Sequence, residues 1–137
     1  MSFPYLILYA DGGSRGNPGP AGAGAYLTDP KGNAVAELKE YLGETTNNVA
    51  EYSALLLGLK HALTLKIPKI LIRMDSQLVV RQIEGSYRVK QAHLQELHRQ
   101  ALALLQNFEA FKIEYIPREK NKQADRLANE AMDSKSL

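Results

Sequence analysis

Four acidic side chains, widely separated in the chain, are the residues best suited to chemistry. Asp11 follows a hydrophobic run and opens a glycine-rich stretch, Glu51 lies just inside an expected helix, and Asp75 ends a second hydrophobic run. Asp125 lies near the start of the last expected helix. Carboxylates held close together raise each other's pKa values, and hard cations such as Mg²⁺ or Mn²⁺ relieve their repulsion. The residue types therefore predict a divalent-metal site if the fold brings the four acids together.

Each acid also has a local structural role open to it. Asp11 before two glycines suits a turn, and Glu51 suits half of a capping box. Asp75 suits a helix N-cap, and Asp125 suits the positive end of a helix dipole. All of these local explanations would have to hold by coincidence, so we interpret the acids as one set.

Hydrophobic patterning places the acids on an α/β framework. Short runs of strand-forming residues alternate with segments of helical periodicity. The expected strands are 5–10, 21–28, 34–42, 69–75 and 111–117, and the expected helices are 47–66, 76–83, 92–106 and a last one after residue 121. The first three strands are close enough in sequence to form an antiparallel meander. The strand–helix–strand unit that ends at residue 75 predicts a parallel pairing.

The order of these elements predicts where the acids meet. If the strand ending at Asp75 pairs in parallel with the first strand, Asp11 and Asp75 lie near the carboxyl ends of neighbouring strands, which are ~4.8 Å apart. Open α/β sheets place their sites at that edge. Glu51 and Asp125 would reach it from the helices that cover the edge.

Polar and small residues mark the expected helix ends. Asn47 or Asn48 suits the cap of the first helix, and Asn121 suits the cap of the last. Gly85 is expected to stop the short helix that follows residue 75. The side chains expected to point inward from the last helix are Ala124, Leu127, Ala128 and Ala131.

Length and composition bound the class of protein. We expect a single domain over residues 1–137, of which about 133–137 form a frayed tail. The absence of cysteine excludes disulfides and thiolate metal sites. The net charge of +2 is only mildly basic, so binding to a polyanion would depend on local arginines and bound cations. No run reaches the ~18 apolar residues of a membrane span, and we expect a monomer in the cytoplasm.

Four motifs, in order along the chain, resemble type 1 ribonuclease H. They are YADGGS with GNPG within residues 9–19, TTNNVAE at 45–51, DSQ at 75–77 and NKQAD at 121–125. The resemblance extends from Tyr5 to about Met132. It implies a mixed five-stranded sheet, three antiparallel strands plus two parallel, flanked by helices. It also implies an endonuclease that cuts the RNA strand of RNA–DNA hybrids with two metal ions and leaves 5′-phosphate and 3′-hydroxyl ends.

The resemblance carries over to individual residues. The four acids fall on the metal-binding carboxylates of the family. Asn17, Asn48 and Gln77 fall on positions that contact the RNA strand in the minor groove. Thr46 and Asn47 fall on a pocket for a DNA phosphate.

The glycine-rich stretch that begins at Gly12 fits neither a dinucleotide fingerprint nor a Walker motif. We interpret its glycines, Gly12 first among them, as permitting close approach of the backbone to a sugar-phosphate strand.

Two departures from the family pattern matter. The stretch at 84–90 is short and the chain has no tryptophan, so it resembles the compact, archaeal-like group that lacks a basic protrusion. The loop 117–121 has no histidine, and Arg118 is the residue that can stand in. A guanidinium cannot act as a base near neutrality, so Arg118 is expected to neutralise the cleaved phosphate.

Several alternatives stay open at the level of sequence. One is a hybrid-binding module without catalysis, although all four acids are present. Another is a 3′–5′ exonuclease or transposase-type enzyme, but such exonucleases carry Asp-x-Glu where Asp11 is followed by two glycines. Activity on double-stranded RNA or on single RNA–DNA junctions is a third. Tyr87, Arg88 and Lys90 suit either contact with nucleic acid or a solvated loop.

Overall fold

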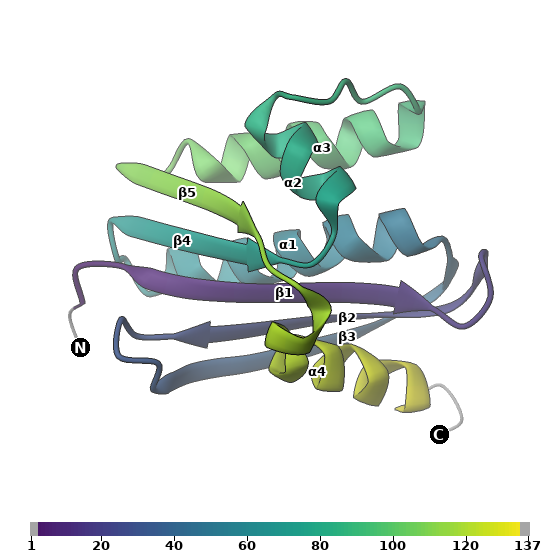
Figure 1. Ribbon diagram of the computed structural model, residues 1–137, viewed down its shortest axis with the longest axis horizontal. Coiled ribbons are helices and arrows are strands. Elements are labelled where there is room, and N and C mark those ends of the chain that lie inside the picture. The colour runs from purple at the N-terminus through teal and green to yellow at the C-terminus, as the bar shows by residue number, and fades with distance from the viewer. Residues whose placement is uncertain (1–2, 135–137) are drawn as a thin grey trace.

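A mixed five-stranded sheet forms the centre of the molecule, with helices on both of its faces (Figure 1). The computed structural model describes residues 3–134. In chain order the elements are β1 (Leu6–Ser14), β2 (Gly19–Thr28), β3 (Ala34–Thr45), α1 (Asn47–Thr64), β4 (Lys69–Met74), α2 (Gln77–Glu84), α3 (Ala92–Leu105), β5 (Ala110–Tyr115), η1 (Arg118–Lys120) and α4 (Lys122–Asp133).

The strand order is β3-β2-β1-β4-β5. β1 pairs with β2, and β2 with β3, in antiparallel fashion. β1 pairs with β4, and β4 with β5, in parallel. The predicted α/β class, with three antiparallel strands plus two parallel, is therefore confirmed.

One face of the sheet packs against α1, behind which α3 lies (Figure 1). Leu6 and Leu8 of β1 are completely buried there, as are Tyr52, Leu55 and Leu59 of α1. β1 is apolar on both faces because helices cover it from both sides, as its sequence predicted.

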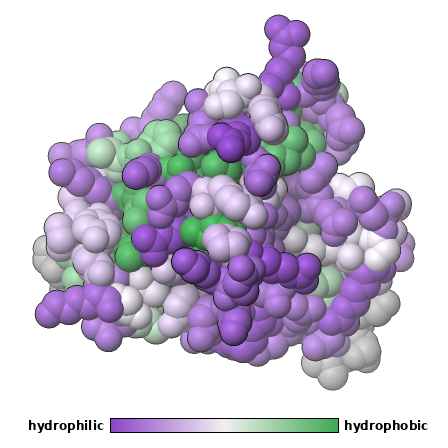
Figure 2. All heavy atoms as spheres, viewed as in Figure 1, coloured by the Kyte–Doolittle hydropathy of each residue, from purple (hydrophilic) through white to green (hydrophobic). Residues whose placement is uncertain are grey.

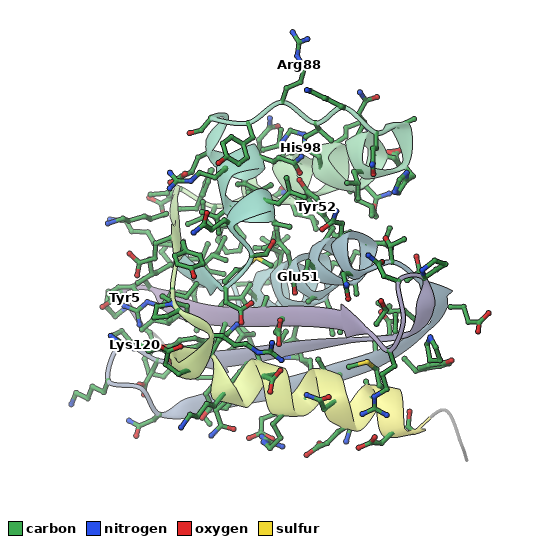
Figure 3. The ribbon with its side chains drawn as sticks, turned by 45° about the vertical axis from the view of Figure 1, so that its right-hand side comes forward. Tyr5, Glu51, Tyr52, Arg88, His98 and Lys120 are labelled. Atoms are coloured by element: carbon green, nitrogen blue, oxygen red, sulfur yellow. The ribbon has the colours of Figure 1, made fainter. Side chains whose placement is uncertain are left out.

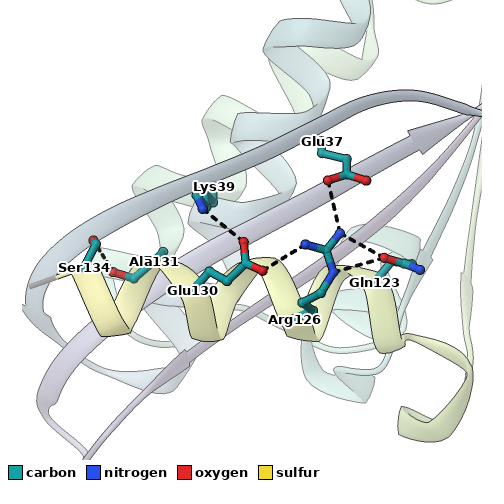
Figure 4. A network of polar contacts seen from close by, with 7 residues as sticks. All are labelled: Glu37, Lys39, Gln123, Arg126, Glu130, Ala131 and Ser134. Carbon is teal, nitrogen blue, oxygen red and sulfur yellow. Dashed lines mark hydrogen bonds and ion pairs between the residues drawn. The ribbon is translucent and has the colours of Figure 1, made fainter.

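The other face of the sheet carries α4, which lies unusually close to β2. A side chain at Gly24 would place its Cβ 2.4 Å from the Ala124 carbonyl oxygen, so the helix backbone rests directly on the strand. The four residues predicted to point inward from α4 are all buried, and Met132 joins them. Ion pairs secure the outer side of the helix, where Arg126 contacts Glu37 of β3 and Glu130 contacts Lys39 (Figure 4).

Three local expectations were wrong. The first strand was expected to end at residue 10, but β1 continues to Ser14, so Asp11 lies within the strand. Thr46 caps α1 by accepting from the Val49 N–H at 3.3 Å, where Asn47 or Asn48 was predicted. Asn121 occupies the N-cap position of α4 but makes no side-chain cap bond.

The expected end of the helix after residue 75 was correct. Gly85 ends α2 with a φ of 89°, in the left-handed region that favours glycine. The tail expected at about 133–137 stays a prediction, because α4 includes Asp133 and residues 135–137 lie outside the described part. Within residues 3–134, no helix is both long and apolar enough to cross a membrane. Hydrophilic side chains cover most of the face seen in Figure 2.

Candidate active site

Three of the four predicted acids meet at the carboxyl ends of β1 and β4. Ala10 pairs with Met74 in the parallel register, so the residues that follow them, Asp11 and Asp75, lie side by side. Glu51 enters from the first turns of α1. One carboxylate oxygen from each of the three acids lies within 4.8 Å of the others. The predicted meeting of these acids at one sheet edge is therefore seen in the structure.

Gly12 explains how Glu51 comes so close to the sheet. A Cβ at Gly12 would lie 2.1 Å from the Ala50 carbonyl oxygen, so only glycine lets α1 approach β1 at this point. The Gly12 N–H donates to Glu51 Oε1 at 2.5 Å. Gly12 lines the cleft, and packing against α1 by itself requires the absence of a side chain there, while the close approach of a sugar-phosphate strand stays a prediction.

Burial and mutual repulsion disfavour ionisation of the carboxyl groups in this cluster. Burial, followed by the charge of Glu51, raises the pKa of Asp11 to about 10. Burial raises the pKa of Glu51 to about 7, although hydrogen bonds with Asp11 and Gly12 oppose that rise. Burial also raises the pKa of Asp75. Without cations, the cluster therefore keeps at least one proton near neutral pH.

Asp125 completes the set from the first turn of α4. Its side chain, 35% exposed, lies near enough to Asp11 to raise the pKa of that carboxyl. Arg118 lies beside it, with a guanidinium nitrogen 3.8 Å from Asp125 Oδ1. The charge of Arg118 also opposes the rise in the pKa of Asp75. All four acids and Arg118 line one cleft of about 530 Å³.

The predicted substrate contacts are distributed around this cleft. Asn47 and Asn48 line it, whereas Asn17, Thr46 and Gln77 lie outside its lining. The Asn47 N–H donates to Asn17 Oδ1 at 3.1 Å, which ties the β1–β2 loop to the start of α1. In the part of the chain that the structure describes, the side-chain N–H groups of Asn17, Asn47, Asn48 and Gln77 have no hydrogen-bond acceptor.

Some cleft residues were not predicted. Ser14 donates through its N–H to Asn47 Oδ1 at 2.8 Å, and Ser76 both caps α2 and hydrogen-bonds Glu51. Asn129, one turn after Asp125, donates to the Asp125 carbonyl at 2.9 Å. Ser14 and Ser76 lie inside the motifs described above, so the sequence could have indicated them. Asn129 lies outside every motif, and nothing in the sequence pointed to it.

The residues outside the cleft include the histidines. His98 of α3 contacts the Gln82 carbonyl at 3.1 Å and packs edge-on against Tyr52. Figure 3 shows Glu51 inside the molecule beside β1, with His98 further out and Arg88 extending away from the body. The described histidines take no part in the acid cluster.

The sheet order and the acidic centre at the ends of β1 and β4 define the class, a domain with the ribonuclease H fold. A family model described as Reverse transcriptase-like matches residues 9–131. A bifunctional protein of Mycobacterium tuberculosis is 48% identical over 130 residues, which are 94% of this chain and 36% of that protein. Ribonuclease HI of Halobacterium salinarum is 43% identical over 91% of this chain and 63% of its own.

A solved structure, LC11-RNase H1 in complex with RNA/DNA hybrid, superposes with a TM-score of 0.91 at 44% identity and covers 96% of this chain and 99% of that one. The chain belongs to the type 1 ribonuclease H family. It spans only about a third of the length of the mycobacterial relative.

Proposed function

We propose that this chain is an endoribonuclease that hydrolyses the RNA strand of RNA–DNA hybrids and leaves 5′-phosphate and 3′-hydroxyl ends. The observation that carries the proposal is the convergence of Asp11, Glu51 and Asp75 within 4.8 Å in an open cleft that Asp125 completes. Membership of the family, and the solved hybrid complex of a relative that is 44% identical, support the choice of substrate.

The four carboxylates fit a pair of Mg²⁺ ions, for which Mn²⁺ can substitute. Hard oxygen donors are the ligands that both cations prefer, and a cluster that otherwise keeps a proton is stabilised by positive charge. When bound, such a pair of cations supplies an activated water and stabilises the leaving oxygen. We assign Asp11, Glu51, Asp75 and Asp125 to holding the pair.

Arg118 is assigned to charge neutralisation. Its side chain is 82% exposed at the rim of the cleft, where an incoming phosphate can reach it. The guanidinium stays protonated and cannot accept a proton from water. It acts on the phosphate as a fixed positive charge.

The amide side chains around the cleft are assigned to the substrate strands. Asn17, Asn48 and Gln77 have free N–H donors with which to recognise RNA, where 2′-hydroxyls distinguish it from DNA. Thr46 and Asn47, at the first turn of α1, are assigned to a DNA phosphate, which the positive end of the helix dipole favours.

The short link between α2 and α3 extends this surface. A groove of about 480 Å³ connects Asn48 with the loop that contains Tyr87, Arg88 and Lys90. Tyr87 is 49% exposed, so its ring is available for stacking. We assign this groove to the hybrid beyond the cleavage site, in place of the basic protrusion that the chain lacks.

The remaining aspects of the proposal are a single domain over residues 1–137 that acts as a monomer in the cytoplasm.

A cleavage gel tests the proposed function. End-labelled RNA is presented as a hybrid, as double-stranded RNA, within a single RNA–DNA junction and as a single strand, next to double-stranded DNA, with Mg²⁺, with Mn²⁺ or with EDTA. We expect metal-dependent cleavage of the hybrid, which Asp11→Asn abolishes. A folded protein that leaves the hybrid intact with either cation refutes the proposal. Cutting of double-stranded RNA or of the junction would broaden the substrate range.

A further inference from the structure

Asn121 lies at the joint between η1 and α4 and is almost completely buried, with 1% of its surface exposed. Its side chain reaches across to the sheet, where Nδ2 donates to the Ala10 carbonyl at 3.0 Å. Ala10 directly precedes Asp11. The bond therefore connects the start of α4 to the strand position from which Asp11 projects.

The backbone of Asn121 contacts the other two residues on this side of the cleft. Its N–H donates to the Arg118 carbonyl at 2.9 Å, and its carbonyl accepts from the Asp125 N–H at 3.1 Å. A single residue is thus bonded to the segments that carry Asp11, Arg118 and Asp125.

The segment around Asn121 has little other attachment. After the Ile116 N–H donates to the Met74 carbonyl at 2.9 Å, the chain leaves the sheet. Within residues 3–134, the Asn121–Ala10 bond is the one hydrogen bond that joins residues 117–124 to the sheet.

An open pocket lies between this segment and the sheet. It has a volume of about 250 Å³ and is lined by residues 119–123 together with Tyr9 and Tyr26. Lys120 lies at the outer edge near the start of α4 (Figure 3). The ion pairs that join α4 to β3 act further along the helix, at Arg126 and Glu130 (Figure 4).

Stability alone is a poor reason for an amide at this position. Asn121 Oδ1 is buried and has no hydrogen-bond partner in the described part of the chain. A buried acceptor without a partner is unfavourable, and an apolar side chain of similar size would avoid it. The Nδ2 donor of the amide does reach the Ala10 carbonyl, and this bond fixes the distance between the start of α4 and β1.

We propose that Asn121 is a positioning residue that sets the separation of Asp11 from Asp125 and Arg118 through its bond to the Ala10 carbonyl. The proposal rests on the proposed function, because it assigns the two acids to one metal centre. Displacing a reacting group by about 1 Å can reduce a rate ~100-fold, so the bond affects turnover more than substrate affinity.

Two variants test this role. Asn121→Leu keeps the number and branching of the side-chain heavy atoms and removes the donor, and Asn121→Ala removes both. The matched control is Asn107→Ala, since Asn107 Nδ2 also donates to a backbone carbonyl at 3.0 Å, but at the exposed end of α3. Each protein is assayed for kcat and KM on a hybrid, and for the increase in Tm that Mn²⁺ produces in the absence of nucleic acid.

We expect both Asn121 variants to fold, to lose at least about tenfold in kcat with KM within about threefold, and to show less than half of the Mn²⁺-induced rise in Tm. The control should match the wild type in all three measurements. Unchanged kcat and Tm shift would overturn the proposal, as would variants that fail to fold, because Asn121 would then be purely structural. If the wild type itself cuts no hybrid, the proposed function fails, and the Mn²⁺ shift still tests Asn121.

Discussion

Replacing the Asp11 carboxyl by an amide, which needs no retained proton, is expected to stabilise the cation-free protein and to abolish its activity. The change is Asp11→Asn, which keeps the shape of the side chain. Ligand oxygens of Asp11, Glu51 and Asp75 lie within 4.8 Å of one another. At that separation two unit charges repel by roughly 3.5 kcal/mol if the effective dielectric constant is about 20.

The proton that Asp11 retains gives a second upper limit on this gain in the free energy of unfolding. Keeping a carboxyl with an ordinary pKa of 3.8 protonated at pH 7 costs about 4 kcal/mol, since each pH unit corresponds to about 1.4 kcal/mol. The two bounds agree, and side-chain relaxation lowers both. We therefore expect Asp11→Asn to raise the free energy of unfolding by about 1–3 kcal/mol at pH 7 without divalent cations.

The gain in stability should depend on pH in a defined direction. Burial raises the pKa of Asp11 to about 10, so as pH rises above 3.8 the unfolded chain ionises first and wild-type folding stability falls. Below about pH 4 the carboxyl is protonated in both states, and variant and wild type should be nearly equal. The difference between them should grow from pH 4 to pH 7.

Urea unfolding at pH 4 and pH 7, in EDTA and in Mg²⁺, measures this difference. Saturating Mg²⁺ should narrow it at pH 7, because the wild type gains more from the cation. Glu40→Gln, an exposed acid on β3, is the control and should change little. A variant no more stable than the wild type at pH 7 in EDTA, or an equal gap at both pH values, would refute the electrostatic reasoning.

Three further predictions follow from the cleft. Arg118→Ala should reduce kcat at least about tenfold and change KM little, because we propose that its guanidinium neutralises charge at the cleaved phosphate; steady-state kinetics check this, and an unchanged kcat removes Arg118 from the mechanism. Gly12→Ala should destabilise the protein by about 2 kcal/mol or more in urea unfolding, because the new Cβ meets the Ala50 carbonyl; wild-type stability would mean that α1 can move away without loss. Hybrid affinity should fall about tenfold between about 50 and 200 mM KCl, as expected for about two neutralised phosphates, and a salt-independent Kd in filter binding would contradict a phosphate-based grip.

The positions of the acids were predictable because hydrophobic periodicity fixes the strands and helices that carry them. The alternation of strand and helix before Asp75 required a parallel pairing, and this pairing alone puts Asp11 beside Asp75. The position of Glu51 follows because helical periodicity places it in the first turns of a helix that covers the same edge of the sheet. Hydrophobic periodicity is a local property of the chain, so it can be recognised in a single sequence.

Other features depend on contacts between distant segments. Asp11-Gly12-Gly13 has the composition of a turn, yet β2 pairs with it as far as Ser14, and this pairing makes it a strand. Thr46 and Asn47 are both favourable N-cap residues. The Asn47 side chain does not cap the helix because its Oδ1 accepts a hydrogen bond from the Ser14 N–H.

The side chain of Asn121 was similarly hidden from sequence. As the residue before a helix it has the preferred identity for a cap, but its amide is used to reach β1. No pattern within the last helix points to a partner 111 residues earlier in the chain.

The contact between α4 and Gly24 has a mechanical consequence for the acidic centre. The helical turn that bears Asp125 rests on a strand residue that lies outside the cleft, with the Leu127 Cβ only 2.8 Å from where a Cβ at Gly24 would stand. Any side chain at Gly24 would clash with this turn and is expected to tilt α4 away from the sheet. The separation of Asp125 from the other acids is thus expected to depend partly on a residue outside the cleft, and even a methyl group at Gly24 should change it.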